Sequence, residues 1–440
     1  MGIQNFPSVL QPIIQQGFLE REFEQALVSR LGYRACADRQ DIAVGIGETL
    51  TKTRAGLKPA VTIPLSPAMN TNLDNGLTPG NWGVEQYTIT INHYAATADL
   101  NMVTSRVGIA SQFLQNAYTN GEQAARSLDE LARNALYSAY FGGNTRVRQT
   151  LGSPGSSVAV DDLRGFQFSF VNGVQQTVSA LNPLTVTIGA NPYAAVGSTP
   201  DTTNVSSTWG GISGVLTLAN TVSIADGTSG NTVLAATASS VIRPSGRGNA
   251  SQLTASDTLT MSCLLDSVAR LRVNAVPEIE GAYNCYLDPV SSRQLFGDPD
   301  FKQLFQGATS ANQVFRKGMT NDFLGLRFMP TTEVFVQQHP LLANVMIRRP
   351  IICGAGALIE GDFAGMAADD VAPSDSIVTL VNGVAMVTRE PIDRLQQIIA
   401  QSWYWIGGFC APSDTTTNPT TVPTATNASF KRAVIVEHAG

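Results

Sequence analysis

The stretch from residue 254 to residue 296 carries the signals of a helix, a turn, a strand and a second helix in direct succession. Thr254 and Asp257 have the spacing of an N-terminal capping box. Five apolar residues then recur at helical spacing and are predicted to form one buried face, namely Leu259, Leu264, Leu265, Val268 and Leu271. Pro277 ends this helix, because proline lacks the backbone N–H that another turn would need. A chain with this order of elements is expected to fold as a mixed α and β protein.

A strand and a second helix follow the proline. Tyr283, Cys285 and Leu287 alternate as they would in a half-buried strand. The pair Asp288-Pro289 ends that strand, and residues 290–296 are predicted to open a new helix. The strand is therefore expected to present one face to a core and the other to solvent.

The residues of this block also carry a resemblance to a known family. They read Val-Ala-Arg-Leu-Arg-Val-Asn-Ala-Val-Pro at 268–277, Gly-Ala-Tyr at 281–283 and Cys-Tyr-Leu-Asp-Pro at 285–289. An acidic-aromatic stretch at 298–301 and a Gly-apolar-x-apolar strand at 324–330 come next. In this order the block resembles the axial domain of the major capsid proteins of tailed double-stranded DNA bacteriophages, the shell proteins with the Hong Kong 97 fold.

The resemblance implies an α+β, Hong Kong 97-like capsid fold, and the composition adds a β-rich insertion domain to it. Its segments would be an N-terminal arm with a helix at 1–44, an extended hairpin loop at 45–100, a peripheral domain with a long spine helix at 101–149, a β-rich insertion at 150–250, an axial domain at 251–378, and a return to the peripheral domain at 379–440 that includes a mobile loop at 412–428. The insertion and the loop lie outside the resemblance itself, and the front half matches by its order of elements.

The spine helix is predicted over Glu122–Phe141, where a broad apolar face precedes the stop signal Gly142-Gly143. A separate helical piece is expected over Val103–Tyr118, with Asn120-Gly121 as the break between the two. Within the extended hairpin, strands are predicted at residues 61–65 and over Tyr87–Ile91.

The insertion has an unusual composition. Between Gln167 and Ile242 only Asp201 and Asp226 are charged, and the segment is rich in Thr, Ser, Ala and Val. Residues 184–188, 215–218 and 222–224 read as short strands, which makes this segment β-rich.

Composition excludes several classes of protein. A hydrophobic content of 43% excludes wholesale disorder, and a net charge of −6 argues against a general nucleic-acid binder. The five cysteines include no C-x-x-C pair, so a zinc or thioredoxin-like site is not expected. Neither a signal peptide nor an apolar run long enough to span a membrane is visible.

Few residues stand out as candidates for a site. Lys52, Arg54 and Lys58 on the hairpin could pair with acidic residues of a neighbouring subunit or form a solvated basic face, and Phe18 and Phe23 of the N-terminal arm are further candidate subunit contacts. The three histidines, His93, His339 and His438, lack a carboxylate or serine at informative local spacing and are expected to be structural. We therefore predict no catalytic, cofactor-binding or metal-binding residues.

The resemblance implies a structural protein that assembles into the icosahedral head shell around the genome of a tailed phage. Its partners would be copies of itself in pentamers and hexamers and packaged double-stranded DNA held without sequence-specific contacts. Scaffolding, portal and decoration proteins are further candidate partners, no membrane is expected, and the protein would be assembled in the host bacterial cytoplasm and located in the virion. The alternatives are an encapsulin-like nanocompartment shell protein and, from another class, a β-rich binding or adhesion protein, with an enzyme as the third.

Overall fold

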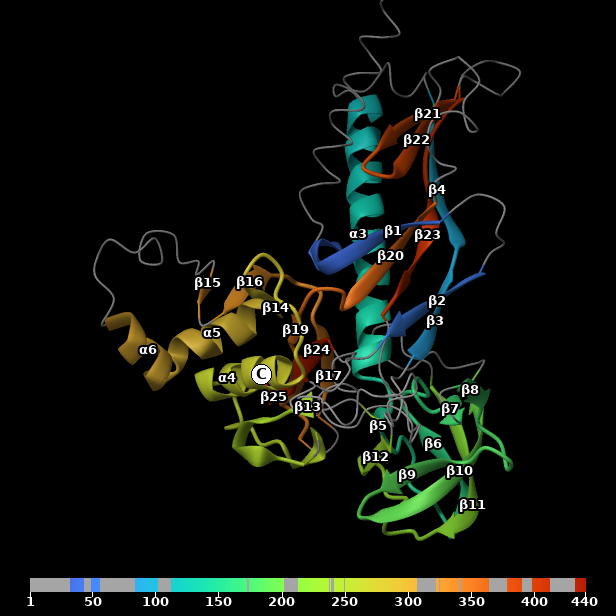
Figure 1. The fold of residues 1–440 in the computed structure, drawn as a ribbon, viewed down its shortest axis with the longest axis vertical. Helices are drawn as coiled ribbons and strands as arrows, with labels where there is room; N and C mark the ends of the chain where they lie inside the picture. The colour runs from blue at the N-terminus through green and yellow to red at the C-terminus, as the bar shows by residue number, and fades with distance from the viewer. Residues whose placement is uncertain are drawn as a thin grey trace, which may run out of the picture. The chain divides into compact units, whose positions relative to one another are not determined.

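The computed structural model describes residues 32–42, 49–55, 84–101, 112–171, 174–201, 213–236, 238, 241–248, 250–306, 322–323, 325–339, 342–363, 378–389, 398–411 and 432–440. The chain divides into two compact units, whose elements are labelled in Figure 1. Unit 1 comprises Met1–Thr51, Thr88–Arg133 and Leu358–Cys410, and unit 2 comprises Lys52–Tyr87, Asn134–Ala357 and Ala411–Gly440.

Unit 1 is a mixed sheet packed against a long helix. Five of the six strands follow one another in the order β1 (Ala37–Ile42), β20 (Leu358–Phe363), β23 (Ile398–Cys410), β22 (Val384–Arg389) and β21 (Val378–Val381), while β4 (Asn92–Asn101) pairs with β23. Trp403 and Trp405 of β23 are buried against Ala124, Ala125 and Leu128 of helix α3 (Gln112–Tyr140). The small alanines let the sheet approach the helix closely, and the two indoles fill the space between them.

Helix α3 corrects one prediction and confirms another. The break expected at Asn120-Gly121 was wrong, because α3 runs through both residues. The Asn120 side-chain Nδ2 donates to the backbone oxygen of Gln401 at 3.2 Å, and this buried contact offsets the weak helix propensity of the Asn-Gly pair. The predicted end was confirmed: α3 stops at Tyr140, and Gly143 has a φ of +78°, which favours glycine.

The extended hairpin is described only at its base. Strands β2 (Thr49–Ala55) and β3 (Val84–Thr90) form a two-stranded sheet, and β3 covers most of the strand predicted over Tyr87–Ile91. The strand predicted at residues 61–65 lies outside the described residues, as do the helix of the N-terminal arm and the loop at 412–428.

The axial block of unit 2 is built on a sheet with β14 at its centre. The six strands follow one another in the order β13 (Val241–Ile242), β24 (Ala433–Val436), β19 (Ile351–Cys353), β14 (Tyr283–Leu287), β16 (Leu326–Pro330) and β15 (Asp322–Phe323). All five residues of β14 are buried, so the expected half-buried strand was wrong. Strand β14 pairs with β16 on one side and β19 on the other, and both of its faces are covered, as is usual for an inner strand of such a sheet.

Helices α4 (Met261–Val273) and α5 (Pro289–Gly297) follow the predicted order, and α6 (Pro299–Gln306) begins in the stretch that was predicted only as acidic-aromatic. Asp288 caps α5 by accepting hydrogen bonds from the N–H groups of Val290 and Ser291. The capping box expected for α4 was wrong, because α4 starts only after Thr260. Thr254 does bond to Asp257 through its N–H at 2.8 Å, but this contact closes a loop ahead of the helix.

Leu265 is also placed differently from the prediction. It is 41% exposed, whereas Leu264, Val268 and Leu271 are buried against the sheet together with Leu259, which precedes the helix. Because each residue of an α-helix advances by about 100°, Leu264 and Leu265 cannot both occupy the centre of one face.

The insertion is a six-stranded antiparallel sheet in the order β5 (Asn144–Arg146), β12 (Thr232–Ala235), β9 (Leu184–Ile188), β10 (Asn191–Pro200), β11 (Gly214–Val222) and β6 (Gly155–Val160). The sheet closes on itself where Val147 bridges Val160 and the N–H of Arg148 donates to the oxygen of Ala159 at 2.8 Å. The insertion is therefore a small closed barrel, with a separate hairpin of β7 (Phe168–Val171) and β8 (Val174–Thr177).

The strand prediction for residues 184–188 was confirmed, and residues 215–218 lie within β11. The separate strand predicted at 222–224 was wrong, because β11 continues to Val222 and Ile224 lies in the turn that follows. The barrel interior is filled by apolar side chains that belong to none of the clusters of the axial block, including Val158, Val186, Ile188, Leu216 and Val233.

The chain enters and leaves the barrel at one place. The first and last strands pair, with Leu234 opposite Asn144, and the N–H of Ala235 donates to the oxygen of Gly143 at 2.8 Å. The barrel is thus inserted between α3 and β13, and its first strand begins at Asn144.

The last described segment was predicted to return to the peripheral domain as part of 379–440. Instead β24 pairs with β19, and β25 (His438–Ala439) pairs with β18 (Met346–Arg349), which also pairs with β17 (Phe335–Gln338). Strands β21, β22 and β23 do belong to unit 1. The six-segment division of the chain as a whole stays a prediction.

The first test of this fold is excision of the barrel. Replacing residues 144–235 with a short linker should leave the rest of unit 2 folded, because the flanking residues already meet and the two apolar cores are separate. Circular dichroism and thermal unfolding of the shortened chain measure whether the helices remain and whether the chain still unfolds cooperatively. Loss of the helical signal at room temperature would contradict the assignment.

The second test concerns Ala275, the second residue after the end of α4. Ala275 has a φ of +53°, in the left-handed region that is unfavourable for alanine and favourable for glycine. Ala275→Gly should raise the free energy of unfolding by about 0.5 to 1 kcal/mol. The matched control is Ala269→Gly inside the same helix, which should lower it by about 1 kcal/mol. Equal effects of the two substitutions in denaturant titrations would contradict the expectation.

Candidate functional site

The predicted subunit contacts lie mostly beyond the described residues. Lys52 lies in β2 with a half-buried side chain, and Arg54 belongs to the same strand, of which only the backbone is described there. Lys58, Phe18 and Phe23 are outside the described residues. The contact role of these five residues therefore stays a prediction.

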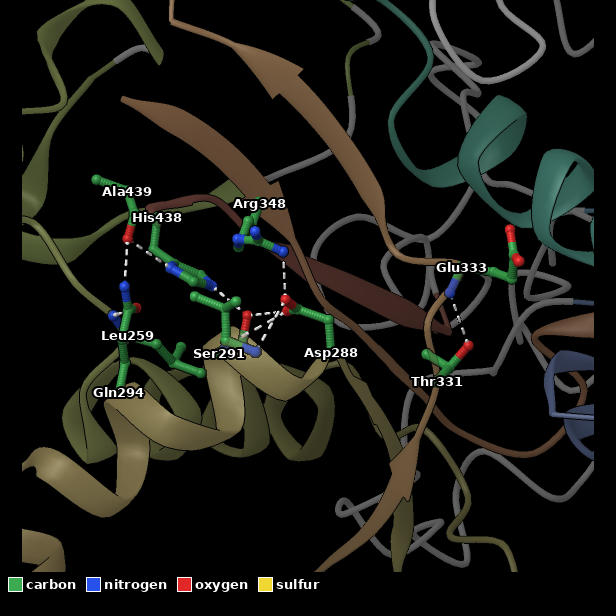
Figure 2. A network of polar contacts seen from close by, with 10 residues as sticks. Leu259, Asp288, Ser291, Gln294, Thr331, Glu333, Arg348, His438 and Ala439 are labelled. Atoms are coloured by element: carbon green, nitrogen blue, oxygen red, sulfur yellow. Dashed lines mark hydrogen bonds and ion pairs between the residues drawn. The ribbon is translucent and has the colours of Figure 1, made fainter. Parts of the chain in front are cut away.

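Polar side chains do gather in two buried networks within unit 2. The first joins α5, β18 and β25 and is shown in Figure 2. The Ser291 Oγ lies 2.8 Å from the His438 Nε2 and also bonds to the Asp288 carboxylate, which in turn pairs with Arg348. Gln294 extends the network, because its Nε2 donates to the Ala439 oxygen at 2.9 Å and its Oε1 accepts from the Leu259 N–H at 3.0 Å.

This first network contains the residue types of a hydrolytic triad, but it is not arranged as one. In a Ser–His–Asp triad the histidine lies between the serine and the aspartate, whereas here the serine lies between the other two, as Figure 2 shows. Ser291 and His438 have no exposed surface, and burial lowers the pKa of His438 to about 4. A neutral histidine that no substrate can reach supports packing of the last strand, and it agrees with the structural role predicted for His438.

The second network surrounds a buried carboxylate. Glu437 has no exposed surface and accepts from the Arg349 Nε at 2.6 Å and from the Arg243 Nε at 2.7 Å. Burial alone would raise the pKa of Glu437, but the two guanidinium groups outweigh it and hold the pKa below its ordinary value. Glu437 therefore stays ionised at neutral pH.

Arg349 is fixed from several sides. Its guanidinium carbon lies 4.7 Å from the ring centroid of Phe141 and 4.8 Å from that of Phe335, and its Nη2 donates to the Gln337 Oε1 at 2.8 Å. These contacts combine charge pairing with stacking on aromatic faces, a geometry that lysine could not reproduce.

A cavity of about 40 Å³ lies beside this network, between the barrel and the axial block. Three arginines and three acidic residues are among its lining side chains: Arg146, Asp161, Asp162, Arg243, Arg349 and Glu437. Arg146 of the barrel donates to the Gln338 oxygen at 2.9 Å, and the Gln337 Nε2 donates to Asp161 at 3.1 Å. With balanced charges and room for about two or three waters, the cavity is a polar joint between two folded parts.

Neither network was predicted from the sequence, although the sequence contains signals of both. An arginine doublet at 348–349 interrupts an apolar strand, and Glu437 directly follows the apolar run 433–436. Charged residues inside apolar strands indicate buried partners, because an unpaired buried charge is costly. The identity of those partners could not be predicted, since Glu437 is 88 residues from Arg349 and 194 from Arg243.

Neither a metal site nor a membrane span is found in the described part of the chain. No group of three or more His, Cys, Asp or Glu side chains is placed there to hold a metal ion. None of the described helices is long and apolar enough to cross a membrane.

Comparisons with known proteins identify the fold. No family model matches the sequence, and no curated protein is significantly similar to it. Among solved structures, the capsid of Ralstonia phage GP4 is similar with a TM-score of 0.50 and 10% sequence identity, over 93% of this chain and 91% of that chain. This chain has a Hong Kong 97-like capsid fold. Two cyanophage capsids are also similar. The P-SCSP1u capsid has a TM-score of 0.47 and 10% sequence identity, over 92% of this chain and 87% of that chain. The Pam1 capsid has a TM-score of 0.43 and 14% sequence identity, over 89% of this chain and 85% of that chain.

The α+β, Hong Kong 97-like fold predicted from the axial motif is thereby confirmed. Within this capsid fold the two buried networks hold the axial block together. They contribute stability, and none of their groups is placed for chemistry on a substrate.

A third prediction tests the second network. Glu437→Gln should lower the free energy of unfolding by about 3 kcal/mol or more, because it leaves buried arginines without a counter-charge. The control is Glu280→Gln, since Glu280 pairs with Arg327 at 2.9 Å but is 80% exposed and should matter by less than about 1 kcal/mol. Denaturant titrations at neutral pH measure both.

The pH dependence of the free energy of unfolding shows in which pH range the contribution of Glu437 should be measured. Because the folded-state pKa of Glu437 is lowered, its contribution is complete above the ordinary value of 4.5 and is lost as the pH falls through the lowered value. A Glu437→Gln variant that matched the wild type at neutral pH would show that the network does not stabilise the fold.

Proposed function

We propose that this chain is a major capsid protein, which assembles into the icosahedral head shell that encloses the double-stranded DNA genome of a tailed bacteriophage. The observation that carries the proposal is the capsid fold, matched to the Ralstonia phage GP4 capsid over 93% of this chain. The axial motif at residues 268–289 supports it independently, because the motif is a property of the amino-acid order and does not depend on the match between folds.

Unit 1 offers a rigid base for subunit contacts. Arg34 is buried and forms a two-pronged ion pair with the fully buried Glu360, with the Arg34 Nε at 3.0 and 2.9 Å from the two carboxylate oxygens. Asp129 of α3 accepts hydrogen bonds from the N–H groups of Gly32, at 2.9 Å, and Tyr33, at 2.5 Å. The point where the N-terminal arm joins the body is thus fixed to both the sheet and the helix.

In a closed shell, each edge of a subunit meets a different edge of its neighbour, so several different segments have to supply contacts. We place the subunit contacts on the arm and hairpin, at Phe18, Phe23, Lys52, Arg54 and Lys58. Many modest contacts add up in one assembly by multivalency, so no single contact has to be strong. Pentamers and hexamers are the expected intermediates.

The charge balance suits a container. A net charge of −6 gives the wall no general affinity for DNA, so the packaged genome is held without sequence-specific contacts. The protein performs no catalysis and needs no cofactor in this role. It is assembled in the host bacterial cytoplasm, with scaffolding, portal and decoration proteins as further partners, and it ends in the virion.

The test is electron microscopy of the purified chain, alone and co-expressed with the products of its neighbouring genes. Closed icosahedral particles or rings of five and six subunits are expected, and native particles should contain double-stranded DNA. Particles filled with a protein cargo and free of nucleic acid would instead indicate a nanocompartment shell. Monomers under every co-expression condition would contradict a shell protein of either kind.

A further inference from the structure

The solvent-facing side of α4 carries an apolar row that the fold does not use. Leu265, Ala269 and Val273 follow one another at intervals of four residues, so they line up along the helix. All three are exposed, Leu265 by 41% and Val273 by 69%, while the opposite side of α4 is buried in the core of the axial block. A row of this kind is more than a scattered surface residue, because its members adjoin.

Charged side chains border this row on both sides. At 100° per residue, Arg272 lies on one side of the row, and Asp266 and Arg270 lie on the other. Arg272 pairs with Glu278 at 3.3 Å, so the charges around the row are two positive and two negative. An apolar centre with a polar rim is the usual anatomy of a protein interface.

The balanced rim favours a protein partner over DNA. A surface for packaged DNA would need an excess of basic residues, which this one lacks. Two copies of a chain with a net charge of −6 repel one another at a distance, and they approach most easily where the local charge is close to zero.

The small area of the apolar row indicates what kind of protein partner can bind to it. Three small or medium side chains cover far less than the roughly 800 Å² per partner that a stable complex needs. A free partner would therefore bind too weakly to stay, whereas a neighbour already held by other contacts would bury the row at little further entropic cost. A second copy of this chain in a shell is such a neighbour.

We infer that Leu265, Ala269 and Val273 form a contact surface for a neighbouring copy of this chain. The inference rests on the proposed function, because only a shell holds the copies together by other contacts. It adds a contact on the axial block to those proposed on the arm and hairpin, and it gives Leu265 a role outside the core.

Site-specific photo-cross-linking of the full-length chain tests the contact. A benzophenone amino acid is placed at position 273, and at position 342 as the control, because Leu342 is 40% exposed in a loop after β17. Irradiated shells should give a covalent dimer from position 273 in several-fold higher yield than from position 342. Free protomers should give no dimer from either position.

Substitution supplies a second readout. Leu265→Ser together with Val273→Ser should leave the melting temperature of the protomer unchanged but raise the free-protomer concentration in equilibrium with shells by about tenfold. Leu342→Ser, matched to Leu265 in exposure, should change neither quantity.

The outcomes separate this inference from the proposed function. If shells form but position 273 gives no dimer, or cross-links only within its own chain or to another gene product, the inference is overturned and the shell assignment stands. If the wild-type chain forms no shells under any condition, the proposed function fails and the inference fails with it.

Discussion

Glu437 carries a charge with no exposed surface, and two arginines from different parts of unit 2 neutralise it. Arg243 directly follows β13 of the axial sheet, and Arg349 comes from β18. Arg349 is held between Phe141, just after α3, and Phe335 of β17. Because a buried carboxylate without its partners is unstable, Glu437 of the last described segment fixes the segment after β13 and strand β18 directly, and the two aromatic residues through Arg349.

Short-range patterns predicted much of this molecule. The strand over 283–287, its end at Asp288-Pro289 and the helix after it depend on contacts within a few residues, and each lies where the sequence predicted it. The stop after α3 is equally local, because Gly143 adopts a conformation that other residues avoid. The family resemblance then supplied the arrangement of these elements, which no local pattern contains.

Predictions from local patterns were wrong where a residue distant in sequence changed the local structure. The Asn120-Gly121 break was outweighed by a bond to Gln401, and Asp257 was occupied by Ser245 and Arg247 in addition to Thr254. The strand expected to be half-buried is an inner strand, because β16 and β19 pair with its two edges. Both buried networks were missed for the same reason, since their members are far apart in sequence. Of the candidate contacts on the arm and hairpin, only Lys52 has a described side chain.

The closed form of the insertion matters for an assembly of many copies. An open six-stranded sheet would present unpaired edge strands to its neighbours, and strand pairing between copies would compete with the intended contacts. Closure through Val147 and Val160 removes the longest of these edges. The closed barrel thus offers less unpaired strand edge to other chains.

The paired entry and exit of the barrel also have a mechanical consequence. A stretching force along the chain from α3 toward β13 acts on Asn144 and Leu234, which are opposite each other in adjacent strands. The hydrogen bonds between these two strands bear the force. The remaining ninety residues or so form a side branch that carries no tension as long as those hydrogen bonds hold. Tension applied through α3 and β13 is therefore expected to break these hydrogen bonds before it reaches the other strands of the barrel.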